Sequence, residues 1–119
     1  MANILIVDDS RTSRRMLKEI LEGMGHTIIA EATNGEEGYT KYTELKPDLV
    51  TLDITMPKLD GIEALTLIRK ADPEAKAVMI TAAGQKDKML KAIKLGALEF
   101  ITKPYEQSDV ERIISGILG

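Results

Sequence analysis

The chain has 119 residues, of which 44% are hydrophobic and 29% are charged, and these values are typical of one soluble globular domain. Its formal net charge of -3 argues against nucleic acid as the main partner, because phosphate binding needs a basic surface. The absence of cysteine excludes disulfides and thiolate metal sites. No apolar run fits membrane insertion or a secretory signal. We therefore expect one cytoplasmic domain over residues 1–119.

Short apolar segments alternate along the chain with stretches of helical spacing. The segments, in chain order, are Asn3–Val7, Thr27–Ala32, Leu49–Leu52, Ala77–Ile80 and Leu98–Ile101. Their lengths are typical of strands, and three of them lack polar alternation. Such runs indicate strands that are buried on both faces, as in a parallel sheet with helices on either side. The pattern predicts an α/β fold in which a βα unit occurs five times.

Apolar spacing and capping residues predict the helices between these strands. Asn34 with Glu37, and Ser108 with Glu111, each match an N-cap followed three residues later by a reciprocal acid. Asp60-Gly61 is expected to open the third helix. The apolar positions are Met16, Leu17, Ile20, Leu21 and Met24 in the first helix, Ile62, Leu65 and Ile68 in the third, and Met89, Leu90 and Ile93 in the fourth.

Charged residues follow three of the predicted strands. Asp8 and Asp9 follow the first, Asp53 the third and Lys103 the fifth, all on predicted loops. Because parallel strands end at one edge of a sheet, we expect these side chains to converge. Two carboxylates about 4 Å apart repel by roughly 4 kcal/mol at an effective dielectric near 20, so the cluster takes up protons or holds a cation. Oxygen ligands favour a hard divalent ion, and the absence of a glycine-centred calcium loop favours Mg²⁺ over Ca²⁺.

A carboxylate beside a metal ion and an ammonium group is suited to accept a phosphoryl group. The metal and Lys103 offset the phosphate charge while an aspartate oxygen attacks phosphorus, which gives an acyl phosphate. Thr81 follows the fourth strand, where its hydroxyl can bond a phosphate oxygen. Each residue alone has a simpler explanation: Asp8-Asp9 as a helix cap, Lys103 as a surface lysine and Thr81 as a strand cap. Their combination favours the site.

Four motifs mark the ends of predicted strands: Asp8-Asp9, the segment from Asp53 to Gly61, Thr81-Ala82 and Lys103-Pro104. Together they resemble the receiver domain of two-component response regulators, and most closely its stand-alone chemotaxis type, over nearly the whole chain. The resemblance implies a single receiver domain over residues 1–119. It also implies a doubly wound, flavodoxin-like three-layer (βα)5 sandwich with strand order 2-1-3-4-5.

The resemblance further implies a set of metal ligands and a phosphoacceptor. A histidine kinase would phosphorylate Asp53. Mg²⁺ would be held by Asp9, Asp53 and the main-chain carbonyl of Thr55, with Asp8 acting through water. The protein would be a signalling protein that assists its own phosphorylation and dephosphorylation, and not an enzyme.

The resemblance also implies a conformational switch that responds to phosphorylation. Lys103 would bond the phosphoryl group, and Thr81 would move toward it. Phe100 would change rotamer together with Thr81, although it also fits a core position. The Lys103-Pro104 bond is usually cis in the family.

With no output domain expected, the signal must leave through a surface that another protein reads. The expected face is formed by the fourth helix, the fifth strand and the fifth helix. The lysines lie on or near the fourth helix and Tyr105 follows Pro104, and a solvated helical face is the commoner explanation for most of these residues. Arg11, Arg14 and Arg15 oppose the dipole at the start of the first helix, which favours docking of a kinase or a phosphotransfer domain over plain solvation. The lysines are Lys86, Lys88, Lys91 and Lys94.

The expected partners of a monomeric receiver are a histidine kinase and a downstream target. That target is a flagellar switch protein in chemotaxis, or a phosphotransfer domain if the chain is a phosphorelay intermediate, and the sequence leaves both open. An FMN binder would need a Ser/Thr/Gly-rich loop where Asp8-Asp9 stand. A small aspartate-nucleophile phosphatase would need a second acid at Thr55.

Overall fold

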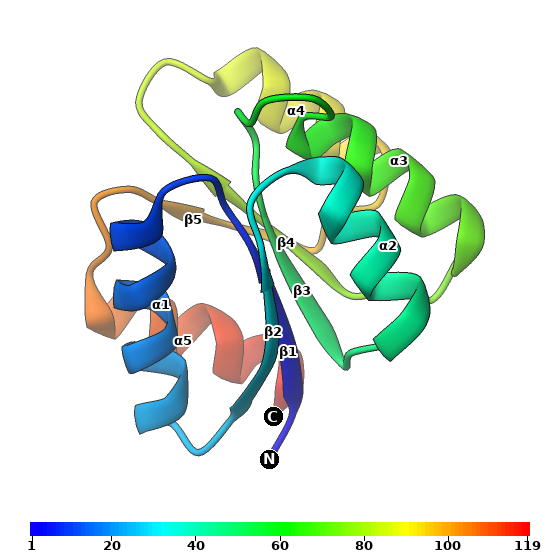
Figure 1. The fold of residues 1–119 in the computed structure, drawn as a ribbon. Coiled ribbons are helices and arrows are strands. Elements are labelled where there is room, and N and C mark those ends of the chain that lie inside the picture. The colour runs from blue at the N-terminus through cyan, green and yellow to red at the C-terminus, as the bar shows by residue number, and fades with distance from the viewer.

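The computed structural model describes residues 1–119 as a five-stranded parallel sheet and five helices (Figure 1). The sheet order is β2-β1-β3-β4-β5, as predicted. None of the helices is long and apolar enough to cross a lipid bilayer. The strands are β1 (Asn3–Val7), β2 (Thr27–Ala32), β3 (Leu49–Asp53), β4 (Ala77–Thr81) and β5 (Glu99–Thr102). The helices are α1 (Arg11–Gly23), α2 (Gly35–Leu45), α3 (Gly61–Ala71), α4 (Lys86–Lys94) and α5 (Gln107–Leu118).

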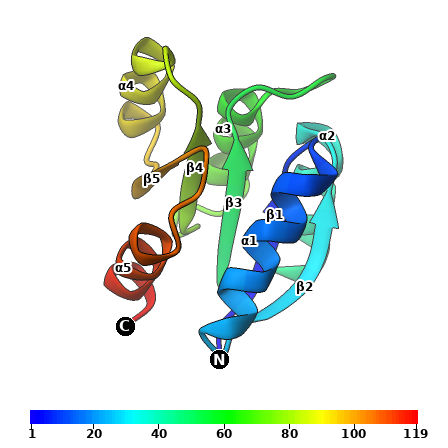
Figure 2. The ribbon, with the colours of Figure 1, turned by 90° about the vertical axis from the view of Figure 1, so that its left-hand side faces the viewer.

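Helices cover both faces of the sheet and give the three predicted layers. Figures 1 and 2 show α1 and α5 on one face and α2, α3 and α4 on the other. Under α1 and α5, Leu17 and Leu21 share one core with Val110 and Ile114. The larger core, under α2, α3 and α4, includes Leu65. Each buried aliphatic side chain contributes about 1.5–3 kcal/mol, so these two cores hold the layers together.

The middle strands are buried on both faces, which agrees with their unbroken apolar sequences. Every residue of β3 and β4 is buried, and only Asn3 of β1 is exposed. The edge strands β2 and β5 are partly exposed. Strand order reverses at β1 and β3, and ligands of such sheets bind beyond the strand ends at this switch point. The fold therefore places a site beyond Val7 and Asp53.

Side-chain caps define the starts of α2 and α3. Asn34 Oδ1 accepts a hydrogen bond from the Glu37 N–H at 2.8 Å, as predicted, but the Glu37 carboxylate accepts from the Thr33 N–H at 2.6 Å instead of returning to Asn34. The complete capping box lies at α3. There the Glu63 N–H donates to Asp60 Oδ1 at 2.9 Å, and the Asp60 N–H donates to Glu63 Oε1 at 3.1 Å. Such a cap stabilises a helix by roughly 1 kcal/mol.

The predicted cap at Ser108 is wrong. α5 begins at Gln107 after Glu106, which makes no side-chain cap, and Ser108 lies in the first turn. The reason is that the Val110 N–H already donates to the Glu106 carbonyl at 3.1 Å, so helical hydrogen bonding starts before Ser108.

Strand ends differ from prediction by one residue at the edge that carries the site. β3 and β4 include Asp53 and Thr81, and β5 is Glu99–Thr102 instead of Leu98–Ile101. The expectation that Asp53 lies on a loop is therefore wrong. The Ile54 N–H donates to the Ile80 carbonyl at 3.1 Å, which continues the sheet past Asp53. Both site residues are consequently held by the sheet itself.

Helix α4 forms where its apolar spacing predicts, but that apolar side is not a core face. Leu90 and Ile93 are 51% and 52% exposed, and Met89 is only partly buried. Ala92 is the one buried residue of this helix. The helical spacing of apolar residues correctly predicted that α4 is a helix. It did not predict how deeply α4 is buried, because burial depends on which other elements pack against the helix.

Candidate functional site

Asp8, Asp53 and Lys103 meet at the carboxyl edge of the sheet. Asp8 directly follows β1, Asp53 ends β3, and Lys103 directly follows β5. Lys103 Nζ lies 2.9 Å from Asp8 Oδ2 and 3.2 Å from Asp53 Oδ2. The two aspartates are 1% and 7% exposed, so water screens these charges weakly. The fold brings together three charged groups that are far apart in the sequence.

Asp8, Asp9 and Asp53 form an acidic cluster whose donors fit a divalent cation. One carboxylate oxygen from each residue lies within 4.8 Å of the others. Asp9 is exposed, which leaves the cluster open to solvent. Asp8 Oδ2 is buried, and its partner is the Lys103 ammonium, 2.9 Å away. A cluster that offers only oxygen ligands and is open to solvent is suited to Mg²⁺.

The electrostatics of the cluster favour an additional positive charge. Burial, and then the neighbouring Asp8 carboxylate, raise the pKa of Asp53 to about 6, with Lys103 opposing the shift. Burial on its own lowers the pKa of the Lys103 ammonium, but its contacts with Asp8 and Asp53 outweigh burial and the net shift is upward. Two buried carboxylates thus share one ammonium, and a cation nearby would favour their ionised forms.

The turn after β3 explains why glycine follows Asp60. A Cβ atom on Gly61 would lie 2.1 Å from the main-chain oxygen of Asp53. The Gly61 N–H donates to the Ile54 carbonyl at 2.9 Å, which holds the start of α3 against the strand end. Any larger residue would displace the backbone that carries Asp53, so only glycine allows this close approach.

The other residues of the expected switch lie on β4 and β5. Thr81 is 1% exposed, and its carbonyl accepts the Lys103 N–H at 2.7 Å. Phe100 pairs with Met79 and packs against the larger core. Because side chains alternate along a strand, Phe100 lies on the same face of the sheet as Thr81, which is two residues beyond Met79. The Lys103-Pro104 peptide bond is cis, as the family resemblance implies.

Tyr105 and the α4 lysines occupy different surroundings. Tyr105 packs against the core beneath α1 and α5, and its hydroxyl is buried without a hydrogen-bond partner. Burial raises the pKa of this hydroxyl. Tyr105 is only partly buried, so its place on the expected signalling face stays a prediction. The lysines are exposed and make no ion pairs; they are Lys86, Lys88, Lys91 and Lys94.

One side chain beside the site was not anticipated from the sequence. Gln85 Nε2 donates to Thr55 Oγ1 at 2.6 Å, and Gln85 Oε1 accepts from the Ala82 N–H at 2.7 Å. Gln85 thereby connects the loop after β3 with the loop after β4. A polar residue ahead of a helix gives no sequence signal for this role, because the role depends on the distance between two loops.

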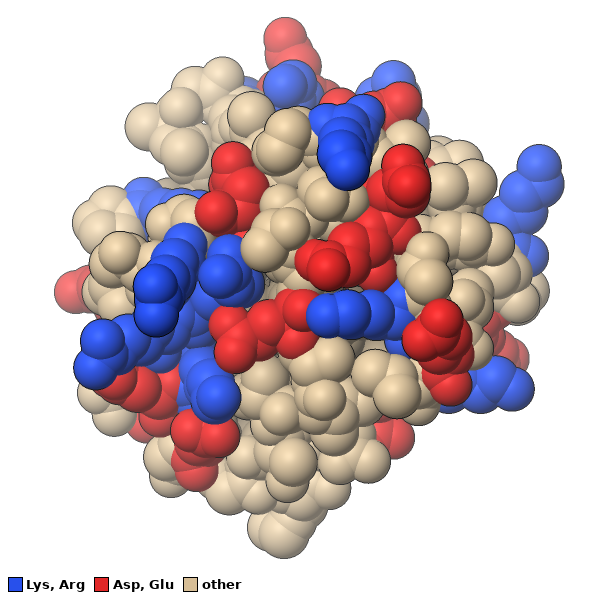
Figure 3. Space-filling view, viewed as in Figure 1, with Lys and Arg blue, Asp and Glu red and all other residues tan.

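The three arginines at the start of α1 are not equivalent. Figure 3 shows basic side chains gathered over this end of α1, on the left of the view. Arg11 and Arg15 are exposed, whereas Arg14 Nη1 donates to the main-chain carbonyl of Asp8 at 2.8 Å. Arg14 therefore faces the site and not solvent, which helical spacing alone did not indicate.

Comparisons with known proteins agree with this architecture. Residues 4–115 match the family model of the response regulator receiver domain. The chemotaxis protein CheY of Thermotoga maritima is 47% identical over 114 residues, which cover 96% of this chain and 95% of that protein. CheY of Listeria monocytogenes is 49% identical over 110 residues, which cover 92% of each chain.

A solved structure of a similar protein has the same fold. A chain of the CheX-CheY-BeF3-Mg complex from Borrelia burgdorferi superposes with a TM-score of 0.93 at 39% identity, over 98% of this chain and 89% of that chain. This chain belongs to the family of response regulator receiver domains.

Proposed function

We propose that a histidine kinase phosphorylates this receiver on Asp53 beside a bound Mg²⁺, and that the phosphorylated form signals in chemotaxis by binding another protein. The observation that carries the proposal is the meeting of the acidic cluster and Lys103 at one edge of the sheet. Similarity to chemotaxis proteins over nearly the whole chain supports the pathway.

Each group at the site has a chemical role in this proposal. Asp53 supplies the attacking oxygen, and with a pKa of about 6 it is mostly ionised at neutral pH. Lys103 already contacts an Asp53 oxygen and can donate to the phosphoryl group once it is attached. Thr81, at the same edge, offers a hydroxyl donor. Mg²⁺ held by the acidic cluster and the Thr55 main-chain carbonyl would offset the charge of the phosphoryl oxygens.

The transfer step involves one bond formed and one bond broken. An Asp53 oxygen forms an O–P bond as the P–N bond of the donor phosphohistidine breaks. The electron pair of that bond leaves on the imidazole nitrogen, and the ring gains one proton from solvent to leave as neutral imidazole. The product is an acyl phosphate, and later attack by water returns the Asp53 carboxylate and inorganic phosphate.

The proposed output surface is the exposed apolar part of α4 together with the residue that precedes β5. Leu90, Ile93 and Leu98 are each about half exposed, with values of 51%, 52% and 50%. Phosphorylation would shift a monomeric receiver toward a conformation in which a flagellar switch protein binds this surface more tightly. The similar Borrelia burgdorferi protein was solved in a complex with CheX, which supports protein binding as the output.

Phosphorylation of purified protein tests the site assignment. Incubation with acetyl phosphate and Mg²⁺ should add one base-labile phosphoryl group, detected by intact-mass spectrometry, and Asp53→Asn should remove this labelling. Asp87→Asn is the matched control, because Asp87 is an exposed aspartate on α4 and should leave labelling unchanged. Equal labelling of wild type and Asp53→Asn would refute the proposed acceptor.

Partner capture tests the pathway. Immobilised protein with beryllofluoride and Mg²⁺ should retain a flagellar switch protein that protein without beryllofluoride does not retain. Leu90→Ser should weaken that capture without changing labelling by acetyl phosphate. Capture of a phosphotransfer domain instead would favour a phosphorelay intermediate and contradict the chemotaxis assignment.

A further inference from the structure

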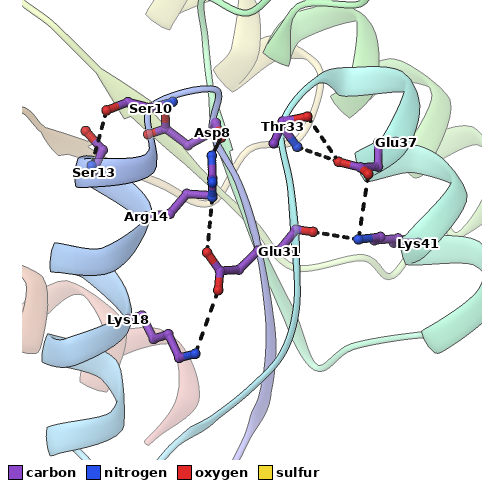
Figure 4. Close-up of polar contacts among 9 residues, drawn as sticks. All are labelled: Asp8, Ser10, Ser13, Arg14, Lys18, Glu31, Thr33, Glu37 and Lys41. Atoms are coloured by element: carbon purple, nitrogen blue, oxygen red, sulfur yellow. Dashed lines mark hydrogen bonds and ion pairs between the residues drawn. The ribbon is translucent and has the colours of Figure 1, made fainter.

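Arg14 links the turn that carries Asp8 and Asp9 to the edge strand β2. Its Nη1 donates to the Asp8 main-chain carbonyl at 2.8 Å, and its Nε lies 3.1 Å from Glu31 Oε1 (Figure 4). The Arg14 side chain is only 14% exposed, while that of Arg15 beside it is 81% exposed. The Arg14 side chain is therefore mostly buried and binds groups of the protein itself.

The contact with the Asp8 carbonyl matters because of how this turn is held. The Asp8 N–H donates to the Ala32 carbonyl at 3.0 Å, and Asp8 Oδ1 accepts from the Ser10 N–H at 2.8 Å. The Asp9 side chain makes no hydrogen bond or ion pair, so its position follows from the peptide that joins it to Asp8. The oxygen of that peptide is the atom that Arg14 binds, which makes Arg14 the side chain that orients the exposed member of the acidic cluster.

Glu31 holds the guanidinium in place and is itself held from two helices. Its carboxylate also lies 3.7 Å from Lys18 Nζ of α1. Its main-chain carbonyl accepts from Lys41 Nζ of α2 at 2.7 Å, and Lys41 in turn lies 3.8 Å from the Glu37 carboxylate. Figure 4 shows these contacts as a chain of charged groups that crosses β2 from α1 to α2. The edge strand thus serves as a fixed anchor for Arg14.

We propose that Arg14, oriented by Glu31, is a positioning residue for Mg²⁺ binding, because it sets the conformation of the Asp8–Asp9 peptide. The inference rests on the proposed Mg²⁺ site. Side chains that orient metal ligands from outside the coordination shell contribute to affinity although they never touch the metal. A simple charge effect has the opposite sign, since removing a cation near carboxylates strengthens their attraction for Mg²⁺. The direction of the change in affinity therefore separates the two explanations.

Titration of the purified protein with Mg²⁺ tests this role. Amide NMR signals of the β1–α1 turn report the dissociation constant for wild type, Arg14→Ala, Arg14→Lys, Glu31→Gln and Arg15→Ala. We expect Arg14→Ala to weaken Mg²⁺ binding about ten-fold or more, with smaller losses in Arg14→Lys and Glu31→Gln. Arg15→Ala removes the same charge from the same helix without touching the turn, and it should stay within about two-fold of wild type.

The outcomes are distinct. Mg²⁺ binding by Arg14→Ala that equals or exceeds that of wild type overturns the positioning role, and circular dichroism establishes whether the variant is folded. If Arg14→Ala does not fold, wild-type affinity in both Arg14→Lys and Glu31→Gln overturns it instead. If the wild-type protein does not bind Mg²⁺, the proposed function is overturned, and this inference with it. If the wild-type protein binds Mg²⁺ and the Arg14 and Glu31 variants bind it equally well, only the inference is overturned.

Discussion

Helices α3 and α4 follow the neighbouring strands β3 and β4, which end in the site residues Asp53 and Thr81, yet the two helices are held very differently. α3 starts with a complete capping box and buries five residues, including Ile62 and Leu65. α4 has no side-chain cap and buries only Ala92. The side of the site that carries the proposed phosphoacceptor is therefore fixed, while the side beyond Thr81 is weakly held. Weakly packed elements are the ones that move at low cost, which suits a signalling surface.

The contrast extends to the loops that precede the two helices. Gly61 presses the start of α3 against the Asp53 backbone, where no side chain fits. The start of α4 is tied across the site by the two hydrogen bonds of the Gln85 side chain. The phosphoryl transfer proposed at Asp53 needs a fixed geometry, and transmission of a signal needs an element with more than one accessible position.

The largest expected effect compares the same substitution in both helices. Leu65→Ala empties a fully buried position in α3 and should lower the free energy of unfolding by about 2–5 kcal/mol. Leu90→Ala removes a half-exposed side chain from α4 and should change it by less than about 0.5 kcal/mol. Urea denaturation followed by circular dichroism measures both. Equal losses would mean that α4 is packed as firmly as α3.

A series of stability measurements at different pH values reports how much the ionised Asp53 carboxylate destabilises the folded protein. Folding raises the pKa of Asp53 from 3.8 to about 6, so it favours the protonated form, and this stability is lost as pH rises through about 6. Asp53→Asn cannot ionise. Without Mg²⁺ it should therefore be more stable than wild type by about 1–3 kcal/mol at pH 8, and this gain should vanish near pH 4.

Thermal unfolding at the two pH values checks the prediction. Asp87→Asn, on the loosely held helix, should show no gain that depends on pH, because Asp87 is exposed. A difference between Asp53→Asn and wild type that is the same at both pH values would show that it does not arise from the ionisation of Asp53.

The smallest expected effects come from the helix starts. Asp60→Ala removes the cap of α3 and should cost about 0.5–2 kcal/mol of stability. Gln85→Ala should change global stability by less than about 0.5 kcal/mol, since α4 has no side-chain cap to lose. It should instead speed amide hydrogen exchange in α4 and leave exchange in α3 unchanged. Protection of α4 that does not depend on Gln85 would contradict its role as a tie between the loops.

Several features of this protein could be predicted from the sequence because they are encoded locally. Unbroken apolar runs predicted the buried strands, and spacing predicted the helices between them. Since parallel strands end at one edge, the position of Asp8, Asp53 and Lys103 after such runs was enough to predict that they converge. Their motifs, together with the family resemblance, extended this to Asp9, Thr81 and the cis bond before Pro104.

Tertiary structure alone decided the features that depend on distances between segments. It placed Asp53 within β3, turned Arg14 toward the Asp8 carbonyl, and set Gln85 between two loops. It also left Leu90 exposed although its spacing is that of a core residue. A local pattern records which residues share a face of a helix or strand. Which groups a side chain then meets depends on the packing of elements distant in the sequence, and no local pattern carries that information.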